Sequence, residues 1–111
     1  MRVLLDECVD ERLRHLFHEH DCQTGRYAGF ASLKNGALLL AAEAKGFHVI
    51  VTVDQHIPDQ QSLANRQISL LILCGRTNRL SDLESLIPAA LDALMSIQPS
   101  HVVSIHRRIA A

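Results

Sequence analysis

Residues 35–54 read NGALLLAAEAKGFHVIVTVD, and they decide the fold class because they join a helix to a buried strand. Asn35 can cap this helix and Gly46 can end it. The helix is apolar on nearly every side, which predicts that it is enclosed within the fold. Residues 48–53 then form a continuous apolar run, as is typical of a central parallel strand. The run stops at Asp54.

The flanking segments continue this alternation of short apolar strands and helices. One helix face is predicted from Val9 to Phe17, and a capping box at Ser81 and Glu84 opens another helix. Pro88 either divides that second helix in two or kinks it. The predicted strands are residues 2–5, 22–24, 48–53, 68–73 and 102–105. This pattern predicts one α/β domain over residues 1–111, with a mainly parallel five-stranded sheet.

Composition excludes several classes of protein. Hydrophobic residues make up 48% of the 111 residues and charged residues 21%, which excludes a disordered chain. The net charge of −1 excludes a uniformly basic nucleic-acid binder. A polyanionic partner would have to meet a local cluster of arginines.

The cysteines and the apolar stretches bear on the location of the protein. Cys8, Cys22 and Cys74 form no CxxC pair, so we expect reduced, mostly buried thiols. The longest strongly apolar stretch, residues 37–42, is far shorter than the roughly 20 residues that a bilayer requires. The start of the chain lacks the pattern of a secretory signal. We therefore expect a soluble, cytoplasmic protein with no membrane partner.

Acidic residues follow two of the predicted strands. Asp6 and Glu7 come after residues 2–5, and Asp54 comes after residues 48–53. Strand ends of an open parallel sheet meet at one rim, where two carboxylates about 4 Å apart would repel by roughly 4 kcal/mol. A bound cation relieves that repulsion, and oxygen ligands of this kind suit Mg²⁺ or Mn²⁺. Asp6 and Glu7 are also suited to a simple helix cap or turn.

The order of these segments resembles the PIN-like nuclease fold, most closely its short branch of toxin-type proteins. The resemblance rests on the strand ending at Asp6 and Glu7, the helix of residues 35–47, and the strand closing on Thr52 and Asp54. It covers roughly the whole chain. It implies a three-layer α/β/α sandwich with strand order 3-2-1-4-5 that cleaves RNA with Mg²⁺ or Mn²⁺. It further implies the toxin of a toxin–antitoxin pair, with an antitoxin protein as partner.

Carried over residue by residue, the resemblance assigns a site. Asp6 and Asp54 become catalytic metal ligands, Glu7 a further catalytic acid, and Thr52 a supporting hydroxyl. Asn35 stands where the family has an acid, and it can ligate only through its uncharged carbonyl. Ala37 replaces a frequent glutamate. These departures predict weak metal binding, and they support an alternative: a PIN-like binding module without catalysis that engages RNA or a protein.

Further polar residues follow the other predicted strands. Arg76, Asn78 and Arg79 come after residues 68–73, on the rim expected for the acids, and can hold a phosphate of a nucleic acid. The alternative is a solvated loop in which an arginine pairs with Asp82 or Glu84. His56, just after Asp54, can act as a base or contact a phosphate, with a surface turn as the alternative. Asp59 is close enough in sequence to Asp54 to join the acidic pocket, although Pro58 fixes a turn between them. The pair Arg107-Arg108 is interpreted as a solubilising tail.

Two other hypotheses remain open at this stage. A phosphoacceptor receiver domain also has an acid pair after its first strand and an aspartate after its third. Receivers need a lysine after the last strand, whereas Ile105 is followed by His106 and two arginines. An apolar helix face together with an exposed strand at the sheet edge would also suit a homodimer.

Overall fold

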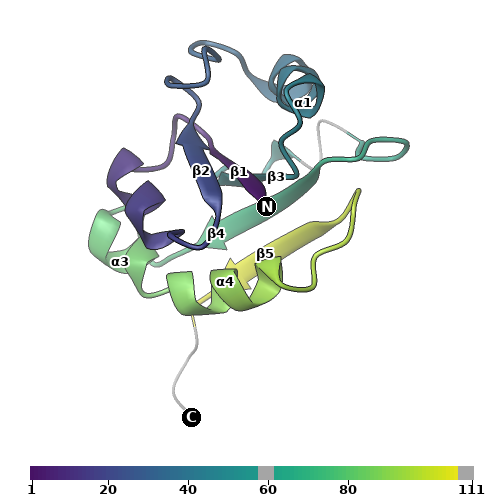
Figure 1. Cartoon of the computed structure of the whole chain (residues 1–111). Coiled ribbons are helices and arrows are strands. Elements are labelled where there is room, and N and C mark those ends of the chain that lie inside the picture. The colour runs from purple at the N-terminus through teal and green to yellow at the C-terminus, as the bar shows by residue number, and fades with distance from the viewer. Residues whose placement is uncertain (58–61, 108–111) are drawn as a thin grey trace.

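The computed structural model describes residues 1–57 and 62–107, and of Asn35 the backbone alone. Within these residues, five strands form one parallel sheet in the order β2-β1-β3-β4-β5 (Figure 1). The strands are β1 (Arg2–Leu5), β2 (Asp21–Thr24), β3 (Val49–Thr52), β4 (Ser69–Cys74) and β5 (Val102–His106). The predicted α/β class and the five-stranded parallel sheet are thus confirmed.

The predicted strand order, 3-2-1-4-5, is wrong. The structure places β1 between β2 and β3, so β2 forms one edge of the sheet and β3 lies near its centre. Leu5 accordingly pairs with Thr24 on one side and with Val51 on the other. The burial of β3 agrees with this order, because all four of its side chains are buried, as is typical of a central parallel strand. The polar β2, with an exposed Asp21, suits an edge.

Apolar side chains alternate between the two faces of the sheet, and helices pack on both faces (Figure 1). Val3 and Leu5 of β1 belong to one core cluster, whereas Leu4 between them belongs to the other. The first cluster includes side chains of the 3₁₀ helix η1 and of α3 and α4, and the second includes those of α1. The helices are η1 (Glu11–Leu16), α1 (Asn35–Ala44), α3 (Leu80–Glu84) and α4 (Ile87–Leu94).

The helix between β1 and β2 is a 3₁₀ helix, where the apolar spacing predicted an α-helix. Length accounts for the difference. Six residues of 3₁₀ helix rise about 12 Å, close to the roughly 13 Å of a four-residue strand. Six residues of α-helix would rise only about 9 Å. The side chain of Asp10 caps η1 by accepting a hydrogen bond from the Arg12 backbone N–H.

Helix α1 differs from the prediction at its start and in its burial. Its N-cap is Lys34 rather than Asn35, and no side chain caps it. Its end agrees with the prediction, because Gly46 follows with a φ of 81° that favours glycine. The expectation of an enclosed helix is wrong, since Leu39 is 1% exposed but Leu40 is 61% exposed. Only one side of α1 packs on the sheet.

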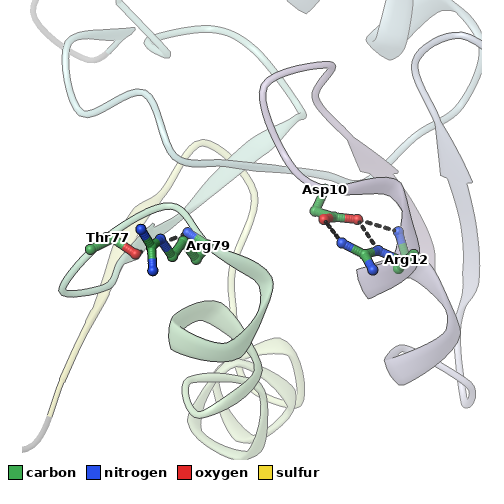
Figure 2. Close-up of polar contacts among 4 residues, drawn as sticks. All are labelled: Asp10, Arg12, Thr77 and Arg79. Carbon is green, nitrogen blue, oxygen red and sulfur yellow. Dashed lines mark hydrogen bonds and ion pairs between the residues drawn. The ribbon is translucent and has the colours of Figure 1, made fainter.

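The two C-terminal helices settle the question raised by Pro88. The helical segment is interrupted between α3 and α4, so there are two helices rather than one kinked helix. Pro88 is the second residue of α4, where its missing N–H costs no hydrogen bond. The predicted capping box is wrong, because the N-cap of α3 is Arg79 and Ser81 lies inside the helix. The Thr77 hydroxyl instead organises this turn. It accepts from the Arg79 backbone N–H at 3.1 Å (Figure 2) and bonds to the Asp82 carboxylate.

Two expectations about the whole chain can be compared with this fold. The cysteines are not paired with one another, but the prediction that they are mostly buried is wrong. Cys8 is exposed, and Cys22 and Cys74 are partly exposed. Among the residues that the structure describes, no helix combines the length and the apolar character needed to cross a bilayer.

Candidate functional site

The sheet topology creates a crevice at the carboxyl ends of β1 and β3. The chain leaves β1 to form β2 on one side and then returns to form β3 on the other. Ligands of open α/β sheets bind at such a switch point. Asp6 directly follows β1, and Asp54 lies two residues beyond β3. Both acids line a pocket of about 780 Å³, together with Glu7. The structure thus brings the three predicted acids together.

The Thr52 hydroxyl links the two aspartates at this pocket. It donates to Asp6 Oδ2 at 2.8 Å and accepts from the Asp54 backbone N–H at 3.0 Å. Thr52 is fully buried, and the Asp6 backbone N–H continues the strand pairing by donating to the Val51 carbonyl at 3.0 Å. The predicted supporting role of Thr52 is therefore matched by its contacts, which fix the Asp6 carboxylate against the end of β3.

Cys8 belongs to the same network, although the sequence analysis gave it no role at the site. Its thiol donates to Asp6 Oδ2 at 3.3 Å and lies 3.4 Å from the Thr52 hydroxyl. Although the Cys8 residue as a whole is exposed, partial desolvation of its sulfur is the main factor that raises the pKa of the thiol. The sulfur therefore keeps its proton at neutral pH and can serve as a donor. A turn closed by the Val9 N–H and the Asp6 carbonyl brings Cys8 back toward the carboxylate. A lone cysteine carries no spacing motif; its position two residues after Asp6 was the available signal.

The other two acids are held by local hydrogen bonds. Asp54 Oδ1 accepts from the His56 backbone N–H at 2.9 Å, and His56 also lines the pocket. Glu7 Oε2 accepts from the Ser32 N–H at 3.4 Å, which turns this exposed carboxylate toward the loop before α1. The Glu7 backbone N–H in turn donates to Asp6 Oδ1 at 2.8 Å. Asp54 and Glu7 therefore each have one hydrogen-bonded oxygen, whereas both carboxylate oxygens of Asp6 accept hydrogen bonds.

The opposite wall of the pocket comes from the start of α1. Lys34 and Leu38 line it, so a lysine residue borders the same pocket as the acids. The sequence analysis did not predict this lysine. The predicted ligand role of Asn35 concerns a side chain outside the structural description, and Asp59 lies in the undescribed residues 58–61.

The donor set decides which ion could bind. Across residues 1–57 and 62–107, no group of three or more His, Cys, Asp or Glu side chains is arranged to hold a metal ion. The protein ligands would then be the two carboxylates of Asp6 and Asp54. Such a set fits Mg²⁺ or Mn²⁺, which bind through one or two carboxylates and complete their shell with water and phosphate. It does not fit a structural zinc site.

The three predicted phosphate-binding residues are separated by the structure. Asn78 lines the acidic pocket, but Arg76 lines a different hollow with His106 and Arg107. The backbone of Arg79 bonds to Thr77 (Figure 2). The alternative of an ion pair to Asp82 or Glu84 is not observed. The ion pairs among the described residues are Arg2–Asp21 and Arg12–Asp10.

Comparisons of the chain with protein-family models, curated proteins and solved structures find no match. Any function must therefore be inferred from the geometry of the pocket. Its defining features are two aspartates joined through one buried hydroxyl and a lysine on the facing wall.

Proposed function

We propose that this protein is a Mg²⁺- or Mn²⁺-dependent ribonuclease of the PIN-like class, built as a three-layer α/β/α sandwich. The observation that carries the proposal is the link from the Asp6 carboxylate through the Thr52 hydroxyl to Asp54, at the switch point of the sheet. The strand order differs from the one that the resemblance implies. The proposal therefore depends on the site and not on the topology.

In this proposal, each residue of the pocket has a separate role in phosphodiester cleavage. Asp6 and Asp54 would hold the ion, which when bound stabilises charge on the phosphate and lowers the pKa of a water molecule. Thr52 and Cys8 keep the Asp6 carboxylate oriented, so binding requires little reorganisation. We assign to Glu7, the third acid that lines the pocket, the role of accepting a proton from the attacking water. Lys34 and Asn78 on the surrounding wall can bind phosphate oxygens.

The biological role that we propose is that of a cytoplasmic toxin whose RNA cleavage is restrained by an antitoxin protein. Among the described residues, Asp6 and Asp54 are the two carboxylates that we assign to the ion, and Lys34 also lines the pocket; this set favours weak cation binding. We therefore expect activity to require millimolar rather than micromolar Mg²⁺.

A second candidate function is a binding module that retains the pocket without catalysis. Two observations favour it. The described residues supply no third metal-binding carboxylate, and Lys34 can itself balance the charge of the aspartates. Such a module would bind RNA or a protein partner with its acids unused. Substituting Asp6 or Asp54 by asparagine would then leave binding intact.

The strand order also matches that of flavodoxin-like and phosphoacceptor receiver sheets. The end of β5 carries His106 and Arg107 where receivers need a lysine, which argues against this function. Incubation with a small phosphodonor checks it directly. We expect no acyl phosphate on Asp54, and its formation would favour the receiver over the nuclease.

The deciding experiment is cleavage of a single-stranded RNA by the purified protein with Mn²⁺. We expect cleavage that a chelator abolishes and that Asp54→Asn reduces by about 100-fold or more. Glu19→Gln provides the control, because Glu19 is an exposed acid that does not line this pocket. No cleavage by the wild type, with RNA binding unchanged in Asp6→Asn and Asp54→Asn, would support the binding module.

A further inference from the structure

A second hollow lies at the carboxyl ends of β4 and β5. It has a volume of about 660 Å³ and is lined by Cys74, Gly75, Arg76, His106 and Arg107. Cys74 and His106 are register partners in the last pair of the sheet. Two adjacent strand ends thus bring Arg76 together with the pair His106-Arg107, which lies thirty residues further along the chain.

In the part of the chain that the structure describes, no ion pair involves the two arginines of this basic hollow. Arg76 and Arg107 are both exposed. None of the five lining residues is acidic. Asp92 lies in the adjoining hollow with His106 and Arg107. Since the whole chain has a net charge of −1, two unpaired arginines in one hollow are a local feature that general composition does not explain.

We propose that the basic hollow binds a phosphate group of the RNA on which the acidic pocket acts; this inference rests on the proposed function. The two sites share one rim of the sheet. The ends of β3 and β5 are separated by two strand spacings, or about 10 Å. Asn78, which follows β4 between them, lines the acidic pocket. An extended single strand of RNA can therefore pass from Asp54, beside Asn78, to Arg76 and Arg107.

The side-chain chemistry selects the ligand. Guanidinium groups present paired N–H donors that match the oxygens of a phosphate, and they remain charged at every physiological pH. The guanidinium groups of Arg76 and Arg107, which follow the neighbouring strands β4 and β5, can both donate hydrogen bonds to one phosphate. Contacts of this kind fix the register of a strand without reading its sequence. The ligand chemistry is shared by free phosphate, so the test must separate the two sources.

The experiment measures binding apart from cleavage. A short fluorescent single-stranded RNA is titrated with the wild-type protein in a chelator, and anisotropy is recorded at several salt concentrations. Arg76→Gln/Arg107→Gln is compared with Arg14→Gln/Arg66→Gln, which removes the same charge from η1 and from the loop before β4. We expect about tenfold weaker binding for the first pair alone. The slope of its log affinity against log salt should become shallower by about 0.7 for each phosphate that the variant no longer binds.

Several results would overturn the inference. The first is RNA binding by Arg76→Gln/Arg107→Gln that equals binding by the wild type. The second is an equal loss of RNA binding in both double variants, which would indicate a general effect of charge. In a parallel arm, inorganic phosphate is titrated alone; binding that depends on Arg76 and Arg107, with RNA binding unchanged, would assign the hollow to free phosphate. Failure of the nuclease proposal is distinguishable, because it appears as absent cleavage whatever the binding result.

Discussion

At the level of single residues, Thr52 is the buried side chain that connects Asp6 to the backbone of Asp54. Its hydroxyl satisfies a carboxylate on one strand and a backbone N–H on its own strand. The sequence analysis could assign Thr52 because it stands two residues before Asp54 in a recognisable element. It could not assign Cys8 or Lys34, because their approach to Asp6 and to the pocket depends on the turn after β1 and on the start of α1.

Removal of the Thr52 hydroxyl should disturb both stability and the site. Thr52→Val keeps the shape but leaves the Asp54 N–H without its acceptor and takes one donor from Asp6. We expect the free energy of unfolding to fall by about 1–3 kcal/mol. Thr52→Ser retains the hydroxyl and should lose less. Urea denaturation measures both variants, and equal losses would show that packing of the methyl group, not hydrogen bonding, determines the effect.

Secondary-structure elements were predicted more accurately than their arrangement. The buried runs at β1, β3 and β4 are apolar at nearly every position, so their location followed from the sequence alone. The order of the strands could not be predicted from the sequence, because it depends on which strands pair in the folded sheet and not on the composition of each strand. The exposure of Leu40 also escaped prediction, since an apolar composition does not identify the side of α1 that meets the sheet.

Helix α1 offers a matched pair of leucines that tests this orientation. Leu39 is 1% exposed and packs in the core cluster with Leu4 and Ile50, whereas Leu40 is 61% exposed. Leu39→Ala should lower the free energy of unfolding by about 2–5 kcal/mol. Leu40→Ala should change it by less than about 0.5 kcal/mol. Denaturant titration compares the two, and a large loss at Leu40 would contradict the orientation of the helix.

The cap of η1 predicts a dependence of stability on pH. Asp10 accepts hydrogen bonds from the Arg12 guanidinium (Figure 2), and this contact lowers the pKa of Asp10 from 3.8 to about 2. The pKa of Asp10 is lower in the folded than in the unfolded state. The ionised carboxylate therefore makes its full contribution to the free energy of unfolding above about pH 4, and this contribution is lost as the pH falls toward 2. In Asp10→Asn, the melting temperature should depend less on pH between about pH 4 and pH 2. An unchanged acid profile in the variant would exclude Asp10 as its source.

At the scale of the whole molecule, topology rather than motif creates the site. The sequence analysis placed acids at strand ends correctly, yet it assumed another strand order. The acids still meet because β1 and β3 are adjacent in the observed sheet. Arg76 and Arg79 were expected to bind one phosphate together. In the structure, Arg76 instead lines the hollow at the end of β5. The direction of the loop after β4 is not encoded in a local pattern.

Metal binding at the switch point should appear as a change in the stability of the whole fold. Mn²⁺ at about 100 times its dissociation constant should add about 2.7 kcal/mol to the free energy of unfolding of the wild type. Asp54→Asn should lose this gain, and in a chelator it should be at least as stable as the wild type because one like charge is removed. Thermal unfolding with and without Mn²⁺ measures both effects. An equal Mn²⁺ response in the variant would place the ion elsewhere.

The central claim is that residues from β1 and β3 bind one divalent cation together. The most direct measurement is anomalous diffraction from a crystal grown with Mn²⁺. We predict a peak within coordination distance of carboxylate oxygens of both Asp6 and Asp54. A saturated crystal with no peak there, or with the Lys34 ammonium between the two carboxylates, would contradict the claim.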